Sequence, residues 1–76
     1  MTTFNPELVA AVRKYEDLLK VQTELGYVFG ASALSFKAFP NPTNFAHMNE
    51  NAAELMLAAA ATDNAKAEVD RLNRTE

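Results

Sequence analysis

The sequence has no cysteine and no tryptophan, and only two glycines among its 76 residues. Without cysteine the chain has no disulfide, no thiolate zinc ligand and no thiol nucleophile. Large apolar side chains are also scarce, because 14 of the apolar residues are alanine and 23 are larger. A chain this short forms at most one domain and buries little surface. We therefore expect residues 1–76 to form one small helical domain that gains stability from self-association or from a partner.

An excess of charge of one sign is missing as well. Seven Lys and Arg stand against ten Asp and Glu, which gives a net charge of −3 and a pI near 5.0. Domains that bind nucleic acid usually concentrate basic residues, so this composition argues against nucleic acid as a partner. The basic residues are also interleaved with acidic ones, which is typical of a solvated helix surface.

Long hydrophobic runs are absent too. The longest uncharged apolar stretch covers residues 25–36 and contains Gly26 and Gly30. It falls short of the roughly 20 residues that cross a bilayer. The N-terminus lacks the basic start and apolar run of a secretory signal. We expect no membrane association and a cytoplasmic location.

The N-terminal half carries clear signals of an amphipathic helix that starts at residue 6 and runs to at least residue 25. Asn5 can cap it, Pro6 suits its first position, and Glu7 complements the positive end of its dipole. Large apolar residues then recur at helical spacing. The predicted stripe consists of Leu8, Val12, Tyr15 and Leu19, widened by Leu18 and Leu25.

Residues 26–39 permit two interpretations: a continued helix, or a break at Gly26 followed by a strand. A lone strand would have no partner strand for its backbone groups, so helix is favoured, with or without a kink or cap at Gly26. Gly26 and Gly30 are four residues apart, a spacing that allows another helix to approach closely. The simpler interpretation is that the helix tolerates both glycines and that neither has a role in packing. A continued helix would place Tyr27, Gly30, Ala31, Leu34 and Ala38 on one side.

Two prolines in residues 39–43 predict a turn, after which Asn41 or Thr43 can cap a second helix. Its predicted core positions step by three and four: Met48, Asn51, Leu55, Ala58, Thr62, Ala65, Val69 and Leu72. The sequence thus predicts an all-α fold, an antiparallel hairpin of helices 6–38 and 42–73 with the first either intact or broken near Gly26. Two or more such hairpins would assemble into a four-helix or larger bundle.

Catalytic and cofactor motifs are missing. His47, Glu50 and Glu54 share one side of a helix and resemble part of a bundle metal site, but a solvated acidic first turn explains them better. No nucleophile motif accompanies the lone histidine, and the two glycines form no phosphate-binding loop. We expect no metal, no cofactor and no enzymatic activity.

Aromatic residues are the most informative feature, because most of them lie in a segment around the turn that carries a single charge, Lys37. A two-helix hairpin cannot bury all of them, so some should contact another chain. The predicted partner-binding residues are Tyr27, Phe29, Phe36, Phe39 and Phe45. A separate candidate set for a small ligand held between subunits is Arg13, Lys14, Tyr15 and Lys20.

These features favour a non-enzymatic protein–protein interaction module that binds itself and a protein partner. It would act as a small adaptor or stoichiometric inhibitor, a type frequent among phage and mobile-element accessory proteins. The alternative is an oligomeric binder of a small ligand such as a nucleotide, with its pocket between subunits. The third hypothesis is a structural component of a larger assembly such as a virion.

Overall fold

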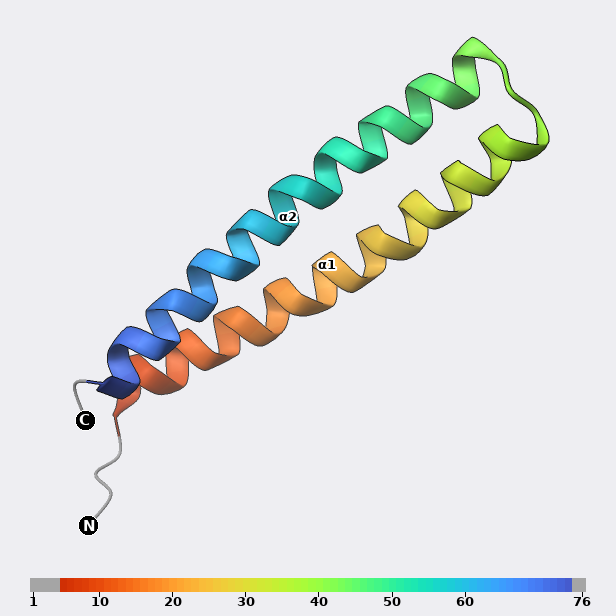
Figure 1. Ribbon diagram of the computed structural model, residues 1–76. Helices are drawn as coiled ribbons and strands as arrows, with labels where there is room; N and C mark the ends of the chain where they lie inside the picture. The colour runs from red at the N-terminus through yellow and green to blue at the C-terminus, as the bar shows by residue number, and fades with distance from the viewer. Residues whose placement is uncertain (1–4, 75–76) are drawn as a thin grey trace.

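The computed structural model describes residues 5–74, which form two long helices, α1 (Pro6–Ala38) and α2 (Pro42–Arg74). The helices run side by side in opposite directions, with the turn at one end of the molecule and the outer ends of both helices at the other (Figure 1). The part of the chain that is described contains no strand. The predicted antiparallel helical hairpin is confirmed, and α2 ends one residue later than expected.

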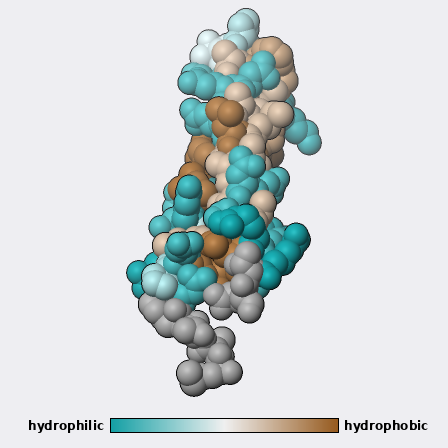
Figure 2. Space-filling view, turned by 90° about the vertical axis from the view of Figure 1, so that its left-hand side faces the viewer, coloured by the Kyte–Doolittle hydropathy of each residue, from teal (hydrophilic) through white to brown (hydrophobic). Residues whose placement is uncertain are grey.

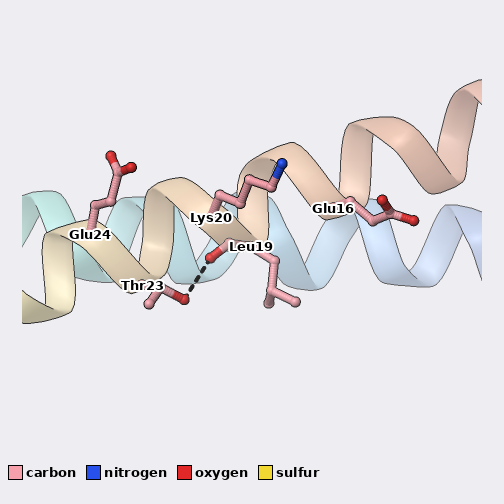
Figure 3. A pocket seen from close by; sticks show the side chains of 5 residues that line it. All are labelled: Glu16, Leu19, Lys20, Thr23 and Glu24. Carbon is pink, nitrogen blue, oxygen red and sulfur yellow. Dashed lines mark hydrogen bonds between the residues drawn. The ribbon is translucent and has the colours of Figure 1, made fainter.

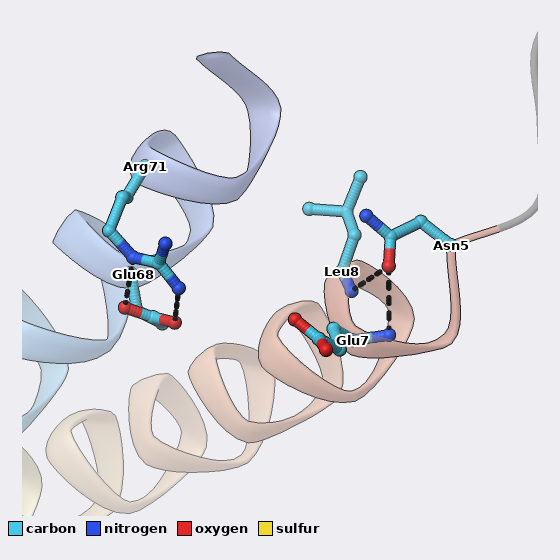
Figure 4. A network of polar contacts seen from close by, with 5 residues as sticks. All are labelled: Asn5, Glu7, Leu8, Glu68 and Arg71. Atoms are coloured by element: carbon cyan, nitrogen blue, oxygen red, sulfur yellow. Dashed lines mark hydrogen bonds and ion pairs between the residues drawn. The ribbon is translucent and has the colours of Figure 1, made fainter. Parts of the chain in front are cut away.

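Each helix begins at a proline, and an asparagine that caps the helix directly precedes it. The Asn5 side-chain oxygen accepts hydrogen bonds from the backbone N–H groups of Glu7 at 3.0 Å and Leu8 at 3.3 Å (Figure 4). At the start of α2, the Asn41 side chain accepts from the N–H of Asn44 at 2.8 Å. These bonds satisfy N–H groups that have no partner within the helix, and they make Asn41, not Thr43, the cap of α2.

The first helix is not broken at Gly26. It continues through both glycines to Ala38, and neither glycine has a positive φ angle. Phe39 caps its end, donating from its N–H to the Ser35 carbonyl at 2.8 Å, just before Pro40. Each internal glycine costs about 1 kcal/mol relative to alanine. Packing along a 33-residue helix is enough to offset that cost.

The two helices meet along a seam of residues spaced three and four apart. All eight core positions predicted for α2 are partly or fully buried, with Thr62, Ala65 and Leu72 the most enclosed. On α1 the seam passes through Leu18, whereas Leu19 is 41% exposed at its edge. Alternating steps of three and four keep one face of each helix against its neighbour, as in a coiled coil.

The seam is thin and partly polar. Asn51 on α2 donates a side-chain hydrogen bond to the Ser32 hydroxyl on α1. The Thr62 hydroxyl donates to the Ala58 carbonyl at 2.8 Å, inside the seam. Among residues 5–74, no side chain is completely enclosed, so the isolated hairpin has little apolar core. Such polar contacts fix the register of two helices more than they add stability.

Candidate interaction surfaces

The turn is held by a side chain that the sequence analysis did not single out. Asn44, in the first turn of α2, donates from Nδ2 to the Phe39 carbonyl at 2.9 Å and to the Ser35 carbonyl at 3.4 Å. Phe39 directly follows α1, where backbone oxygens lack partners within the helix, and the Ser35 carbonyl also accepts from the N–H of Phe39. The only sequence signal for this role of Asn44 was its position three residues after Asn41, which caps α2. Asn44 therefore fixes how the turn presents its aromatic residues.

Three phenylalanines lie near this turn and differ in exposure. Phe36 is half-buried, and its ring lies 5.5 Å from that of Phe45 at a 50° tilt. Phe45 is 48% exposed and Phe39 is 70% exposed. Tilted ring pairs at this separation attract one another. Phe36 thus belongs to the hairpin's own packing, Phe39 is open to another molecule, and Phe45 has a part in both. We call these three residues the turn-end cluster.

The other two predicted partner-binding residues lie elsewhere on α1. Phe29 is half-buried in the seam. Tyr27 is 77% exposed, on an outer stripe that continues to Leu34, which is 69% exposed. Nine helical residues separate Tyr27 from Phe36, about 13 Å along the axis at the usual helical rise. The five predicted aromatics therefore do not form one patch.

Exposed apolar side chains are found along most of the hairpin. Figure 2 shows brown patches between hydrophilic ones on one face. The large apolar residues exposed by more than 40% in the described chain are Leu19, Val21, Tyr27, Val28, Leu34, Phe39, Phe45, Met56 and Leu57. Exposed apolar surface commonly marks a site of association where it is large and continuous.

The four residues predicted to hold a small ligand do not converge on one site. Tyr15 is half-buried in the seam, whereas Arg13 is exposed. Lys14 borders a surface hollow between the helices, near Ala61 and Glu68. Lys20 borders a different hollow on α1 alone, beside Glu16, Leu19, Thr23 and Glu24, where Leu19 and Thr23 point the same way (Figure 3).

The acidic and histidine side chains considered for metal binding are solvent-facing. His47, Glu50 and Glu54 are all exposed. His47 borders a hollow near Val28 and Asn44. Within residues 5–74, no three His, Asp or Glu side chains are grouped in a way that could hold a metal ion.

The open end of the hairpin carries a solvated ion pair. Arg71 donates to Glu68 through Nη2 at 2.6 Å and Nε at 3.0 Å (Figure 4). The hydrogen bond from Arg71 lowers the pKa of Glu68 below its ordinary value, and the bond to Glu68 raises the pKa of Arg71. Both side chains are well exposed, so water screens this pair and its stabilising effect is small.

Comparisons with known proteins return nothing for this chain: no family model, no curated protein and no solved structure matches it. Over the part of the chain described, neither helix combines the length and apolar character needed to cross a membrane.

Proposed function

We propose that the protein is a non-enzymatic protein–protein interaction module that acts as a small adaptor or stoichiometric inhibitor. Its binding surface for the partner is the turn-end cluster. The single observation that supports this most is the exposure of Phe39, 70% open at a turn whose geometry is fixed by Asn44. An ordered, exposed aromatic side chain loses little conformational entropy on binding and buries a large apolar area.

The contrast between the two ends of the hairpin supports this placement. Around the turn, Lys37 is the only charged residue between Leu25 and His47. The open end carries Glu68, Arg71 and other charged residues in contact with water. Interface centres are depleted in charge and enriched in aromatic residues, so the turn end has the composition of a binding site.

Site-specific photo-crosslinking tests this proposal in cells of the protein's source. A photoreactive phenylalanine analogue replaces Phe39, and the same analogue replaces Asn73 at the open end as the control position. We expect position 39 to yield a covalent adduct with a protein other than a second copy of this chain, and position 73 to yield no adduct with such a protein. Adducts with such a protein only from position 73, or from neither position, would contradict the proposal.

Alanine substitutions then separate binding from folding. Phe39→Ala should leave helicity unchanged and weaken the captured complex by about 2 kcal/mol or more, as for an interface anchor. Phe36→Ala removes a half-buried ring in contact with Phe45 and should lower stability by about 3 kcal/mol. A Phe39→Ala variant that binds as tightly as the wild type would move the site away from the turn.

A further inference from the structure

One side of the hairpin is apolar and uncharged over its central part. Surface hollows near Lys14 and Val28 on α1, and near His47 and Ala61 on α2, mark one side of the seam. By helical geometry the residues that flank the seam on its opposite side form a second surface. We call it the glycine face, and it consists of Leu19, Thr23, Gly26, Gly30 and Ala33 on α1 and Ala52, Met56 and Ala59 on α2.

Both glycines of the chain lie on this face, and nothing in the hairpin requires them. A methyl group built on Gly26 or on Gly30 would meet no atom within 4 Å. Their φ angles are also ones that any residue adopts. Alanine at either position would favour the helix by about 1 kcal/mol. The hairpin alone therefore gives no reason for glycine here, whereas close approach of another helix does.

The hairpin exposes more surface than a compact monomer of its mass. A folded monomer of this mass exposes about 4,600 Å² by the usual scaling of surface with mass. The chain exposes 5778 Å², about 1,200 Å² more. A standard interface covers about 800 Å² on each partner. One flat side of the hairpin packed against an equal surface of standard size would cover about two thirds of this excess.

We propose that the occupant of the glycine face is a second copy of this chain, packed in the reverse direction to form an antiparallel four-helix dimer. This inference uses a surface different from the turn-end cluster and does not rest on the partner-binding proposal. A two-fold symmetric interface requires a surface complementary to itself. The glycine face satisfies this requirement. When the second copy is rotated by a half-turn about an axis through the middle of α1, its Leu19 lies within one helical turn of Gly26 of the first copy, so a large side chain faces a small one.

Charges at the two ends of this side favour the reversed orientation. Towards the open end, the side of the hairpin that bears the glycine face carries three acidic residues, Glu16, Asp63 and Asp70, and one basic residue, Lys66. Towards the turn it carries Lys37 alone. Reversed packing brings Lys37 near the acidic end of the other copy, whereas packing in the same direction sets the acidic ends side by side. The opposite side of the hairpin carries more charge, including Glu24, Glu50 and Glu54 in its middle, and suits water better.

Substitution of Gly30 tests the interface, with its neighbour Ala31 as the matched control. Gly30→Leu adds a side chain to the glycine face. Contrary to the sequence prediction, Ala31 does not share that side; it is exposed and borders the hollow on the other side of the seam, where Ala31→Leu adds a larger side chain. By sedimentation equilibrium, the wild type and Ala31→Leu should show twice the 8.4 kDa chain mass. Gly30→Leu should bind its second copy at least about 30-fold more weakly, the loss expected at an interface centre. Circular dichroism establishes that both variants remain helical, and the smaller change Gly30→Ala should weaken the dimer less.

A distance measurement tests the orientation. The chain has no cysteine, so Lys37→Cys carries a single nitroxide label. In the reversed dimer the two labels lie at opposite ends, on the order of 40 Å apart from the helical rise. A separation near 20 Å or less would overturn the antiparallel arrangement. A monomeric wild type, or a Gly30→Leu variant that dimerises as tightly as the wild type, would overturn the glycine face as the interface.

Discussion

Two leucines of α2 allow the packing account to be tested by the same substitution in two environments. Leu72 is 5% exposed and Leu57 is 73% exposed. Both lie within α2, so Leu→Ala changes helix propensity equally at either position. Any difference between the two variants therefore measures the contribution of packing against α1.

The magnitudes follow from burial and from the place of each residue. Truncation of a buried leucine costs about 2–5 kcal/mol, part of it from the cavity that remains. Leu72 lies two residues before the end of α2, where neighbours can partly collapse, so we expect about 2–3 kcal/mol. Leu57→Ala should change stability by no more than about 0.5 kcal/mol, as at other exposed positions. For a domain of this size, a difference of about 2 kcal/mol between the two variants corresponds to roughly 8–16 °C in Tm.

Thermal and urea unfolding followed by circular dichroism at one fixed protein concentration would measure both values. The concentration is held constant because self-association raises apparent stability. Leu57 also lies outside the glycine face, so dimer formation should not bury it. An equal loss in the two variants, or a loss below about 0.5 kcal/mol for Leu72→Ala, would refute the seam described above.

Three further outcomes are expected. Asn44→Ala should destabilise the hairpin by about 1 kcal/mol, measured by urea unfolding, because the last carbonyls of α1 lose a donor; the exposed Asn49→Ala is the control. In an NMR titration the Glu68 pKa should lie below its ordinary value and rise in Arg71→Gln. The stability that this ion pair contributes is present above the ordinary pKa of a glutamate side chain and is lost as the pH falls through the lowered pKa of Glu68. Added salt should reduce the same contribution. Chelator treatment should leave Tm unchanged, whereas a large drop would revive a metal site at His47.

Helix positions and boundaries were predictable because they follow from local chemistry. The asparagine–proline pairs at residues 5–6 and 41–42 mark both helix starts, and the steps of three and four in α2 identify its seam. The predicted stripe ran through Leu19 with Leu18 beside it, and this was wrong, because Leu18 lies in the seam and Leu19 is 41% exposed. The packing of α2 against α1 decides which of the two leucines lies in the seam.

The candidate interaction surfaces were harder to predict from the sequence than the helices. Clustering along the chain suggested one aromatic patch, but helical rotation and rise direct Tyr27 away from the turn and Phe29 into the seam. The contacts of Asn44 depend on how the turn places α2 beside the end of α1, which no local motif states. The open space around Gly26 and Gly30 likewise depends on the path of the neighbouring helix.

We propose that this hairpin is completed by association through the apolar surface that it leaves exposed. The most direct measurement is the Tm of the wild-type protein across low- to high-micromolar concentrations, with the mass determined by light scattering at each point. We predict that Tm rises with concentration and that the mass approaches twice 8.4 kDa. A cooperatively folded 8.4 kDa monomer whose Tm does not depend on concentration would contradict it.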